Sequence, residues 1–316
     1  MKKVLDVTGR IFLGIIVFII SVFVLVVGGL NVAKFAIYSD YYSVKSNVCK
    51  NPGLGDGFVC QGICAYEEGE KFFVSGYMKD GSASRIYVTD KNDDSYYVSL
   101  YLDGKKFDAH AGGIAVHADK VYVSDFDAIY IIRLSDVLGA KKGDTVEISE
   151  VISVDNAGSA LYADGEYLYV GEFHNGTNYV TDHPYETPDG TYYAIISCYS
   201  FDDLTKPVKV YSIRNEVQGM CFTPNGKVIL STSYGLADSH YYIYDESKAI
   251  DSGLTHEGAP VYYLCETEKV VKGPAMAEGL DYYDGKIITL TESASTKYIF
   301  GKFFFANKIV ALDFDK

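Results

Sequence analysis

Five segments of this chain repeat one pattern, and the repeat constrains the fold more than any other feature. Each segment starts with a small residue, continues through an apolar stretch and a tight turn, and ends in a second β-rich stretch. Asp-Gly or Asn-Gly pairs at 164–165, 225–226 and 284–285 supply the positive φ that two-residue hairpins require. We therefore predict five antiparallel hairpins, which begin at Gly62, Gly113, Ser159, Gly219 and Gly279.

Two further β-rich runs follow each of the first four hairpins. After the second hairpin they are AIYIIRL and VEISEVISV, and after the fourth they are HYYIYD and PVYYLCE. Four strands that recur about every 50 residues are typical of propeller blades. A helical solenoid would need apolar stripes with a period of 3.6 residues, and none is present beyond the first thirty residues. We predict an all-β propeller over residues 58–316, with five blades favoured and six as the alternative if one repeat has drifted.

The last repeat is incomplete, because only KYIFGKFFF and KIVALDF follow its hairpin. Propellers often complete the last blade with a strand from the other end of the domain, and the segment from Tyr42 to Phe58 is positioned to supply it. Cys49 and Cys60 flank a turn in this segment and are the best candidates for a disulfide that would pin the strand. The six cysteines otherwise lack the spacing of a disulfide framework or a zinc site.

A run of twenty uncharged residues, 11–30, precedes the repeats. At about 1.5 Å per residue a helix of this length spans about 30 Å, which matches the hydrocarbon core of a bilayer. A cleaved signal peptide has a shorter apolar region, and residues 33–37 are a poor cleavage site, although a removed signal remains the alternative. Lys2, Lys3 and Arg10 precede the run, which by the positive-inside rule places the N-terminus in the cytoplasm.

These observations divide the chain into four parts. We predict a cytoplasmic N-terminus over residues 1–10, a membrane-spanning signal anchor over 11–30, a linker with a possible blade-closing strand over 31–57, and an extracellular propeller over 58–316. Beyond residue 30 the chain carries 41 acidic and 25 basic residues, a net charge of −16. A surface of that sign repels nucleic acid phosphates and suits cations or cationic partners. Nucleic acid is therefore not an expected partner, whereas an unknown extracellular ligand or protein is.

The channel mouth is where a site is expected. In a propeller the first strand of each blade lines the central channel, and the loops that enter it open on the same face as the loops that leave the second strand. These loops predict a rim composed of Gln61, His110, Asp125, Glu172, His174, Gln218, Glu278 and Glu292. Oxygen atoms of Gln61, Gln218 and Glu278 suit Ca²⁺, which prefers 6–8 oxygen ligands. The alternative is that these side chains only satisfy backbone groups at the channel mouth.

Two histidines on this face, His110 and His174, are candidates for a general base or a metal ligand. Structural hydrogen bonding is the alternative for both. The insertion at 175–190 is a candidate lid, because long loops in compact domains are usually functional or disordered. Its aromatic and imidazole side chains that could cover the channel are Tyr179, His183, Tyr185 and Tyr192. The chain contains neither a G-x-S-x-G nor an H-E-x-x-H motif.

The segments VQGMCFTPNGKVILSTSYG and MAEGLDYYDGKIITLTES resemble blades of NHL-repeat and SMP-30/paraoxonase-like propellers. In the SMP-30-like branch the resemblance implies a divalent cation in the channel and hydrolysis of lactones or esters. Glu278, the acid before a lead glycine, matches that pattern. The chain departs from it with Gln61, Gln218 and Gly158, where those enzymes have Asn and Asp ligands.

The sequence therefore leads to two hypotheses of different classes. The first is a membrane-anchored extracytoplasmic propeller that acts as a binding or scaffold module, because no nucleophile is paired with a base. The second is a Ca²⁺-dependent lactonase or esterase-like hydrolase with its site at the channel mouth.

Overall fold

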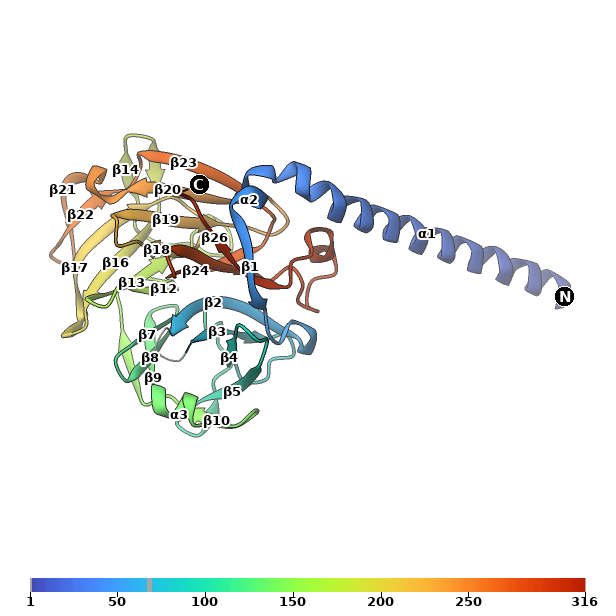
Figure 1. The fold of residues 1–316 in the computed structure, drawn as a ribbon, viewed down its shortest axis with the longest axis horizontal. Helices are drawn as coiled ribbons and strands as arrows, with labels where there is room; N and C mark the ends of the chain where they lie inside the picture. Colours follow the sequence, from blue (N-terminus) through green and yellow to red (C-terminus); the bar gives the residue numbers. More distant parts are fainter. Residues whose placement is uncertain (1, 67–69, 316) are drawn as a thin grey trace.

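The computed structural model describes residues 2–66 and 70–315 of the chain, apart from the side chains of residues 2–7. It begins with α1 (Lys2–Ile37) and a short helix α2 (Ser39–Val44), which lead into a ring of β-sheets (Figure 1). Short segments outside the blades are η1 (Leu54–Asp56), α3 (Leu134–Leu138), β14 (Tyr185–Thr187), β15 (Gly190–Tyr192), η3 (Glu246–Lys248) and η4 (Phe300–Phe304). The predicted turn of the first hairpin, residues 67–69, lies outside the described residues.

The described residues form five antiparallel blades, counted here from the channel outward. The first contains β2 (Phe58–Tyr66), β3 (Lys71–Met78), β4 (Arg85–Asp90) and β5 (Ser95–Leu102), with β6 (Lys105–Lys106) and β10 (Thr145–Glu147) at its outer edge. The second contains β7 (Gly113–His117), β8 (Lys120–Asp125), β9 (Ala128–Arg133) and β11 (Glu150–Ser153). The third contains β12 (Gly158–Ala163), β13 (Tyr167–Glu172), β16 (Ala194–Ser200) and β17 (Asp203–Ile213), extended by β22 (Ala259–Tyr263) and β21 (Ile250–His256). The fourth contains β18 (Val217–Phe222), β19 (Lys227–Thr232), β20 (Ser239–Asp245) and β23 (Thr267–Gly273).

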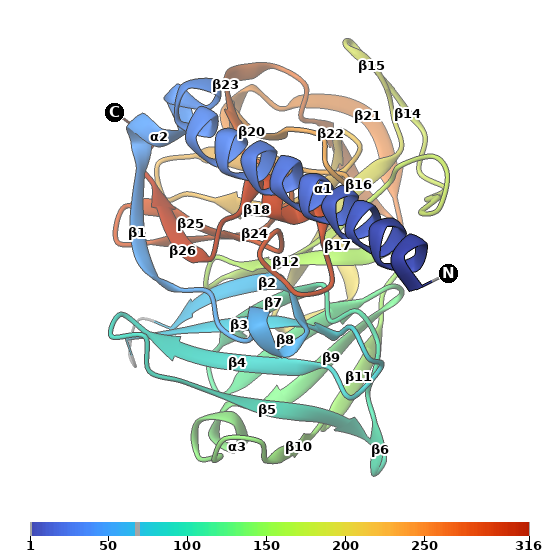
Figure 2. The ribbon, with the colours of Figure 1, turned by 90° about the vertical axis from the view of Figure 1, so that its right-hand side faces the viewer.

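The fifth blade joins the two ends of the propeller. It contains β24 (Ala277–Tyr283), β25 (Lys286–Thr291), β26 (Lys308–Leu312) and, as its outermost strand, β1 (Lys45–Lys50). In β1 Asn47 lies opposite Val310 in an antiparallel pair, and Figure 2 shows β1 running beside β26. The fold is thus a five-bladed propeller, as the sequence predicts, and the six-blade alternative is wrong.

The backbones of the innermost strands approach one another closely around the axis. A Cβ atom added to Gly62 would lie 2.7 Å from the nitrogen of Ile114 in the second blade. One added to Gly113 would lie 2.2 Å from the nitrogen of Leu161 in the third blade. Equivalent contacts follow Gly219, at 2.7 Å from the nitrogen of Leu280, and Gly279, at 2.9 Å from the nitrogen of Ile63. The repeat therefore begins with a small residue because a side chain there would occupy the neighbouring backbone.

The hydrogen-bond register shifts one of these positions by a residue. Ala160 pairs with Gly171 in the third blade as Gly113 pairs with Ser124 in the second. Ala160, and not Ser159, is therefore the structural equivalent of the lead glycines. Both residues are small, so the sequence pattern alone does not distinguish them.

Two runs that the sequence assigns to one repeat belong to a neighbouring blade. The PVYYLCE run contains β22, which pairs in parallel with β17 of the third blade, and β23 takes the fourth position in its own blade. The VEISEVISV run divides between β10, which joins β5 of the first blade, and β11. Outer strands have free edges and can pair with either neighbour, which a strand pattern does not reveal.

The predicted Cys49–Cys60 disulfide is not formed. Both cysteines are buried free thiols, because β1 carries Cys49 on the outermost strand of the fifth blade whereas Cys60 lies on the innermost strand of the first. The Cys60 Sγ atom is held instead by Asn51 Nδ2, at 3.1 Å, and the carbonyl oxygen of Thr291, at 3.4 Å. Burial raises the pKa of both thiols, so they remain protonated small hydrophobic groups.

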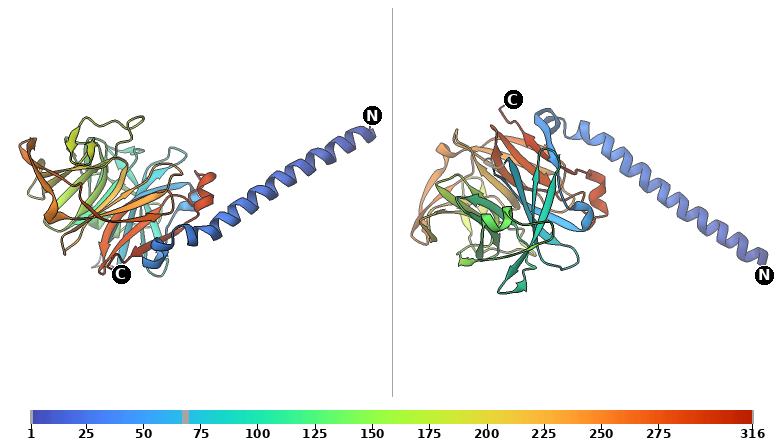
Figure 3. Two further views of the ribbon diagram at one scale, coloured as in Figure 1. Left: turned by 90° about the horizontal axis from the view of Figure 1, so that it is seen from above. Right: turned by 60° about the horizontal axis from the view of Figure 1, so that its bottom comes forward.

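One described helix segment, Thr8–Ile37, is long and apolar enough to cross a bilayer. It spans 30 residues with a mean hydropathy of 3.2 over its most apolar window, and its apolar side chains are exposed along its length. Only its base contacts the propeller, where Asn31 Nδ2 donates to the carbonyl oxygen of Lys302 at 2.8 Å and the Phe23 ring packs against Phe303. Figure 3 shows the helix projecting from the propeller beside η4.

The close approach at the axis predicts a large cost for a single methyl group. We expect Gly113→Ala to lower the free energy of unfolding by about 1–3 kcal/mol or more, because the contact at 2.2 Å is with backbone that cannot rotate away. Gly55→Ala is the matched control, since nothing lies within 4 Å of an added Cβ there, and its effect should stay within about 0.5 kcal/mol. Denaturant unfolding of the detergent-solubilised chain measures both, and equal stability of the two variants would contradict the argument.

Candidate functional site

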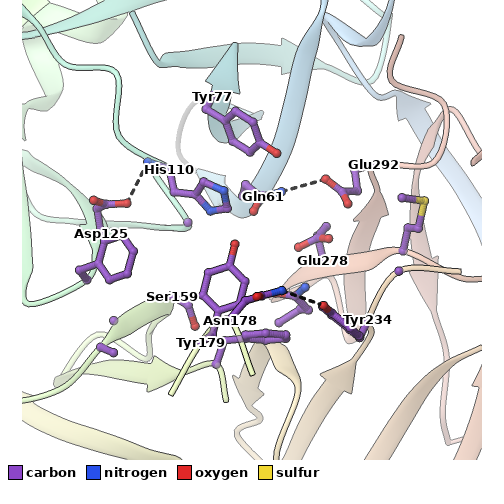
Figure 4. A pocket seen from close by; sticks show the side chains of 18 of the residues that line it. Gln61, Tyr77, His110, Asp125, Ser159, Asn178, Tyr179, Tyr234, Glu278 and Glu292 are labelled. Carbon is purple, nitrogen blue, oxygen red and sulfur yellow. Dashed lines mark hydrogen bonds between the residues drawn. The ribbon is translucent and has the colours of Figure 1, made fainter. Parts of the chain in front are cut away.

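A cavity of about 460 Å³ opens at the channel mouth (Figure 4). Its wall is formed by the loops that enter the first strands and the loops that leave the second strands. Six of the eight residues that the sequence assigns to the rim line it, namely Gln61, His110, Asp125, Gln218, Glu278 and Glu292. Residues distant in the chain therefore meet at this opening because the blades share one axis.

Two buried carboxyl groups are the dominant chemical feature of the cavity. Glu278 lies on β24, directly before the lead glycine, and Glu292 directly follows β25; their exposed fractions are 2% and 9%. The Oε2 atom of Glu292 accepts hydrogen bonds from Gln61 Nε2 at 3.2 Å and from the Tyr298 hydroxyl at 3.1 Å. The Glu278 carboxyl accepts none from the described residues, and Figure 4 shows it within the cavity.

Burial and mutual repulsion keep the two carboxyl groups partly protonated at neutral pH. Burial, and then the negative charge of Glu292, raise the pKa of Glu278 well above its usual value. Burial also raises the pKa of Glu292 to about 7, although the Tyr298 hydroxyl and the charge of Lys297 oppose the shift. Two carboxyl groups that share a site cannot easily both ionise. The pair therefore retains at least one proton near neutrality and would gain from a positive charge placed between its members.

Aromatic rings surround this acidic floor. The six aromatic residues that line the cavity are Tyr77, Phe126, Phe173, Tyr179, Tyr234 and Tyr298. Phe173 packs edge-on against Tyr179, with ring centroids 5.3 Å apart, and the Asn178 amide donates to the Tyr234 hydroxyl. Ring faces beside carboxyl groups are suited to cations, because the face of an aromatic ring carries negative charge density.

The protein's own Lys297 shows how these rings receive a positive charge. Its Nζ atom lies 4.5 Å from the centroid of Tyr77 and 5.1 Å from that of Tyr298. It also donates a hydrogen bond to the Tyr77 hydroxyl. Because Lys297 is exposed on a loop, its ammonium occupies the mouth and leaves the two carboxyl groups below it without a cationic partner.

His110 forms part of the wall opposite the carboxyl groups. Its ring stacks on Tyr77 with centroids 4.4 Å apart, and its backbone nitrogen donates to Asp125 Oδ1 at 2.8 Å. Loss of water around the ring, and then the charge of Lys297, lower the pKa of His110, so the imidazole is neutral at pH 7. Burial raises the pKa of Asp125, although the backbone amides of His110 and Ala111 oppose the shift.

Glu172 and His174 do not line the cavity, although the sequence places them on its rim. The Glu172 carboxylate accepts the backbone nitrogens of Ala157 and Ile195, at 2.9 and 3.0 Å. His174 is buried, and its Nδ1 atom lies 2.9 Å from the hydroxyl of Thr181. Both side chains hold local structure, because β13 ends with their side chains turned toward the insertion that follows it.

The insertion covers the cavity with fewer residues than the sequence suggests. Tyr179 lines the wall, together with Asn178, Val180 and Thr181. Tyr185 and Tyr192 instead pair with each other across the β14–β15 hairpin, and His183 bonds to Glu172. The aromatic residues that the sequence analysis missed, such as Tyr77 and Tyr298, lie beyond the strand ends in loops whose course the strand pattern does not define.

The donor set proposed for Ca²⁺ is a poor fit to that ion. Gln61 Nε2 donates to the carbonyl oxygen of Cys60 and to Glu292, and Gln218 Nε2 donates to the carbonyl oxygen of Ser233. The remaining acidic ligands are two carboxyl groups, one of which already accepts two hydrogen bonds. Ca²⁺ usually takes 6–8 oxygen ligands with several ionised carboxylates, which this floor does not supply.

No protein-family model and no curated protein matches this chain. Solved structures with some similarity include the glutaminyl cyclase of Myxococcus xanthus, with 10% identity, a TM-score of 0.47, and coverage of 85% of this chain and 96% of that one. The WD40 β-propeller domain of Doa1 has 12% identity, a TM-score of 0.42 and coverage of 78% and 79%. Hydrazine synthase of Kuenenia stuttgartiensis has 12% identity, a TM-score of 0.40 and coverage of 74% and 56%, so this chain spans little more than half of it. Similarities this low carry no inference about activity, and the fold assignment rests on the sheet topology.

The carboxyl pair makes stability depend on pH. A carboxyl whose pKa is raised on folding stabilises the fold below its unfolded pKa of about 4.5, and that contribution is lost as the pH rises through the folded value. For Glu292 the loss occurs up to and beyond about pH 7, and for Glu278 it extends higher. We expect Glu278→Gln to be more stable than the parent protein at pH 8 by at least about 2 kcal/mol, and the gain to shrink toward pH 5.

Denaturant unfolding at both pH values measures this difference. Glu166→Gln is the matched control, since it removes the same charge from an exposed carboxyl and should show no such pH dependence. A gain for Glu278→Gln that is equal at pH 5 and pH 8 would contradict the assignment of raised pKa values.

Proposed function

We propose that this protein is a membrane-anchored propeller that binds a small organic cation at its channel mouth. The observation that carries the proposal is the Glu278–Glu292 pair, two buried carboxyl groups at the floor of a cavity with aromatic walls. A cation between them would relieve the repulsion that raises their pKa values and would displace the shared proton.

The walls support the same ligand class. Aromatic residues bind ammonium groups through their ring faces, and quaternary ammonium recognition by several rings is the best-known use of this contact. The Lys297 ammonium already lies over Tyr77 and Tyr298, so these ring faces accept a cation in this geometry. A volume of about 460 Å³ is large enough for a small organic molecule and far exceeds the needs of a bare ion.

We further propose that α1 anchors the propeller in a membrane with its N-terminus in the cytoplasm and the propeller outside. The exposed apolar helix supports the anchor, and the basic residues Lys2, Lys3 and Arg10 before the span support the orientation. From Arg10 to Asn31 the helix covers about 31 Å, which matches the hydrocarbon core. The polar contacts of the helix with the propeller, at Asn31 and Lys34, fall at the end of this stretch.

The loop that carries η4 supports this placement. Ile299, Phe300 and Phe305 are exposed by 68%, 59% and 40%, and the neighbouring Phe303 packs on Phe23 within the apolar stretch of α1. An apolar loop beside a membrane helix is suited to the bilayer interface. Lys297 and Tyr298 of the cavity wall precede this loop directly, so the cavity mouth would lie near the membrane surface.

The resemblance to SMP-30-like propellers favours a different function, hydrolysis that depends on a cation in the channel. Glu278 fits that pattern, but Gln61 and Gln218 donate their amide groups to protein acceptors. The described cavity wall also offers no side-chain nucleophile hydrogen-bonded to His110. We therefore favour a binding module over a hydrolase.

Calorimetric titration of the detergent-solubilised full-length protein tests the ligand class. Choline and its uncharged isostere 3,3-dimethyl-1-butanol have the same shape, so we expect choline to bind at least about tenfold more tightly at pH 8. Its affinity should rise from pH 6 to pH 8, because the ligand favours the ionised pair, and binding should release protons. Glu292→Gln should weaken choline binding by about tenfold or more, and Glu166→Gln should not.

Equal binding of the charged and uncharged isosteres would contradict the proposal, as would choline affinity that Glu292→Gln leaves unchanged. Titration with CaCl₂ in the same cell distinguishes the hydrolase alternative. Tight Ca²⁺ binding that disappears in Glu278→Gln, together with Ca²⁺-dependent hydrolysis of lactones, would favour that alternative instead.

Cysteine labelling of intact cells tests the orientation. The six native cysteines are buried, so a membrane-impermeant maleimide should react with introduced exposed thiols. We expect Lys142→Cys, in an exposed loop of the propeller, to be labelled from outside, and Lys3→Cys to be labelled only after permeabilisation. The reverse pattern would place the propeller in the cytoplasm.

A further inference from the structure

A second cluster of ligating side chains lies outside the channel cavity. Asp155, His183 and His256 each offer one atom, and these three atoms lie within 4.8 Å of one another. The three residues come from separate parts of the chain. Asp155 lies between β11 and β12, His183 lies in the insertion of the third blade, and His256 ends β21.

The hydrogen bonds of His183 leave one ring nitrogen free for a ligand. Its Nδ1 atom lies 2.9 Å from Glu172 Oε2, and because a carboxylate only accepts, Nδ1 carries the proton. The Nε2 atom is then the unprotonated nitrogen. Histidines that bind metals usually donate their other N–H to a carboxylate, which fixes the tautomer and the direction of the ring.

Glu172 is well placed for this supporting role. Its side chain is fully buried, and it also accepts hydrogen bonds from the backbone nitrogens of Ala157 and Ile195. These contacts fix the carboxylate, and the carboxylate in turn fixes the His183 ring. The position of the imidazole is therefore set by the blade itself and not by the insertion alone.

His256 supplies a second, independent observation. Its Nε2 atom is buried and makes no hydrogen bond with any described residue, although it lies 3.2 Å from Asp155 Oδ2. A buried ring nitrogen without a hydrogen-bond partner is costly, because it has lost its contact with water. The ring of His256 meets that of His183 edge-on, with centroids 4.8 Å apart, so both imidazoles converge on one point.

We propose that Asp155, His183 and His256 bind a divalent transition metal ion of the Zn²⁺ class. Two imidazoles and a carboxylate are a common ligand set for such ions, and a fourth position stays open for water. Around a tetrahedral Zn²⁺ the ligand atoms lie about 3.4 Å apart, so the side chains need to close by about 1 Å from their present spacing. Asp155 is 61% exposed and can make most of this movement.

The site would connect three elements that the sheets hold only in part. His256 lies at the tip of the β21–β22 hairpin, which leaves the fourth blade and pairs with the third. His183 belongs to the insertion of the third blade, and Asp155 belongs to the loop that leads into β12. The same loop contains Ala157, which lines the channel cavity and is held by Glu172. The metal would thus fasten the insertion and the hairpin next to the cavity wall.

Metal titration of the full-length protein in detergent, with any affinity tag removed and after treatment with chelator, tests this site. We expect one equivalent of ZnCl₂ to bind with a Kd below about 10 μM by calorimetry. Co²⁺ at the same site should give the intense visible absorption of a four-coordinate ion. CaCl₂ and MgCl₂ should not compete, because imidazole is a poor ligand for hard cations.

Variants separate the proposed ligands from general effects on folding. His183→Ala and His256→Ala should each weaken Zn²⁺ binding at least about tenfold, and Glu172→Gln should weaken it about 10–100-fold through the ring of His183. Asp155→Asn changes an exposed side chain, so it should lower the affinity without changing the thermal unfolding of the metal-free protein. His240→Ala, on β20, is the matched control and should bind Zn²⁺ as the parent does.

Two results would overturn the proposal. One is Zn²⁺ affinity weaker than about 100 μM in the parent protein. The other is tight Zn²⁺ binding that Asp155→Asn and His256→Ala both leave unchanged while His240→Ala removes it. Neither result bears on the channel cavity, whose ligand titration uses different residues.

Discussion

The close approach of the five innermost strands at the axis is the constraint on which the rest of this structure depends. Gly113 and its equivalents leave no room for a side chain, so the backbones of neighbouring blades touch. Five blades around one axis leave a narrow channel, and side chains at the ends of the inner strands must then converge. The small residues that open each repeat are thus the cause of both the closed ring and the shared opening.

The same convergence explains the electrostatics of the cavity. Glu278 precedes a lead glycine and Glu292 follows the paired strand, so one hairpin delivers two carboxyl groups to the same point. Water is largely excluded there, and the repulsion between the carboxyl groups is correspondingly strong. Such an arrangement costs stability and is typical of positions where a protein meets a ligand. The loop after Glu292 then runs from the cavity wall to the base of α1, which joins the site to the anchor.

The sequence predicted those features that local patterns encode. The hairpin turns at 164–165, 225–226 and 284–285, the apolar run at 11–30 and the recurring small residues each reflect backbone requirements that depend on a few neighbouring residues. Six rim residues could be placed at the cavity because their positions follow from the repeat. Glu172 and His174 occupy equivalent positions but turn toward the insertion after β13, which the other blades lack. The aromatic wall was missed because Tyr77 and Tyr298 reach the cavity from loops with no repeating pattern.

The sequence by itself determined that this chain forms a ring of hairpin units behind one apolar helix, because turn chemistry, strand alternation and apolar length act locally. Only the tertiary structure decided which outer strands change blades, where Cys49 and Cys60 lie, and that Asp155, His183 and His256 converge. Those outcomes depend on pairing between free strand edges and on the paths of insertions. They depend on contacts between residues far apart in the chain, and no local pattern specifies such contacts.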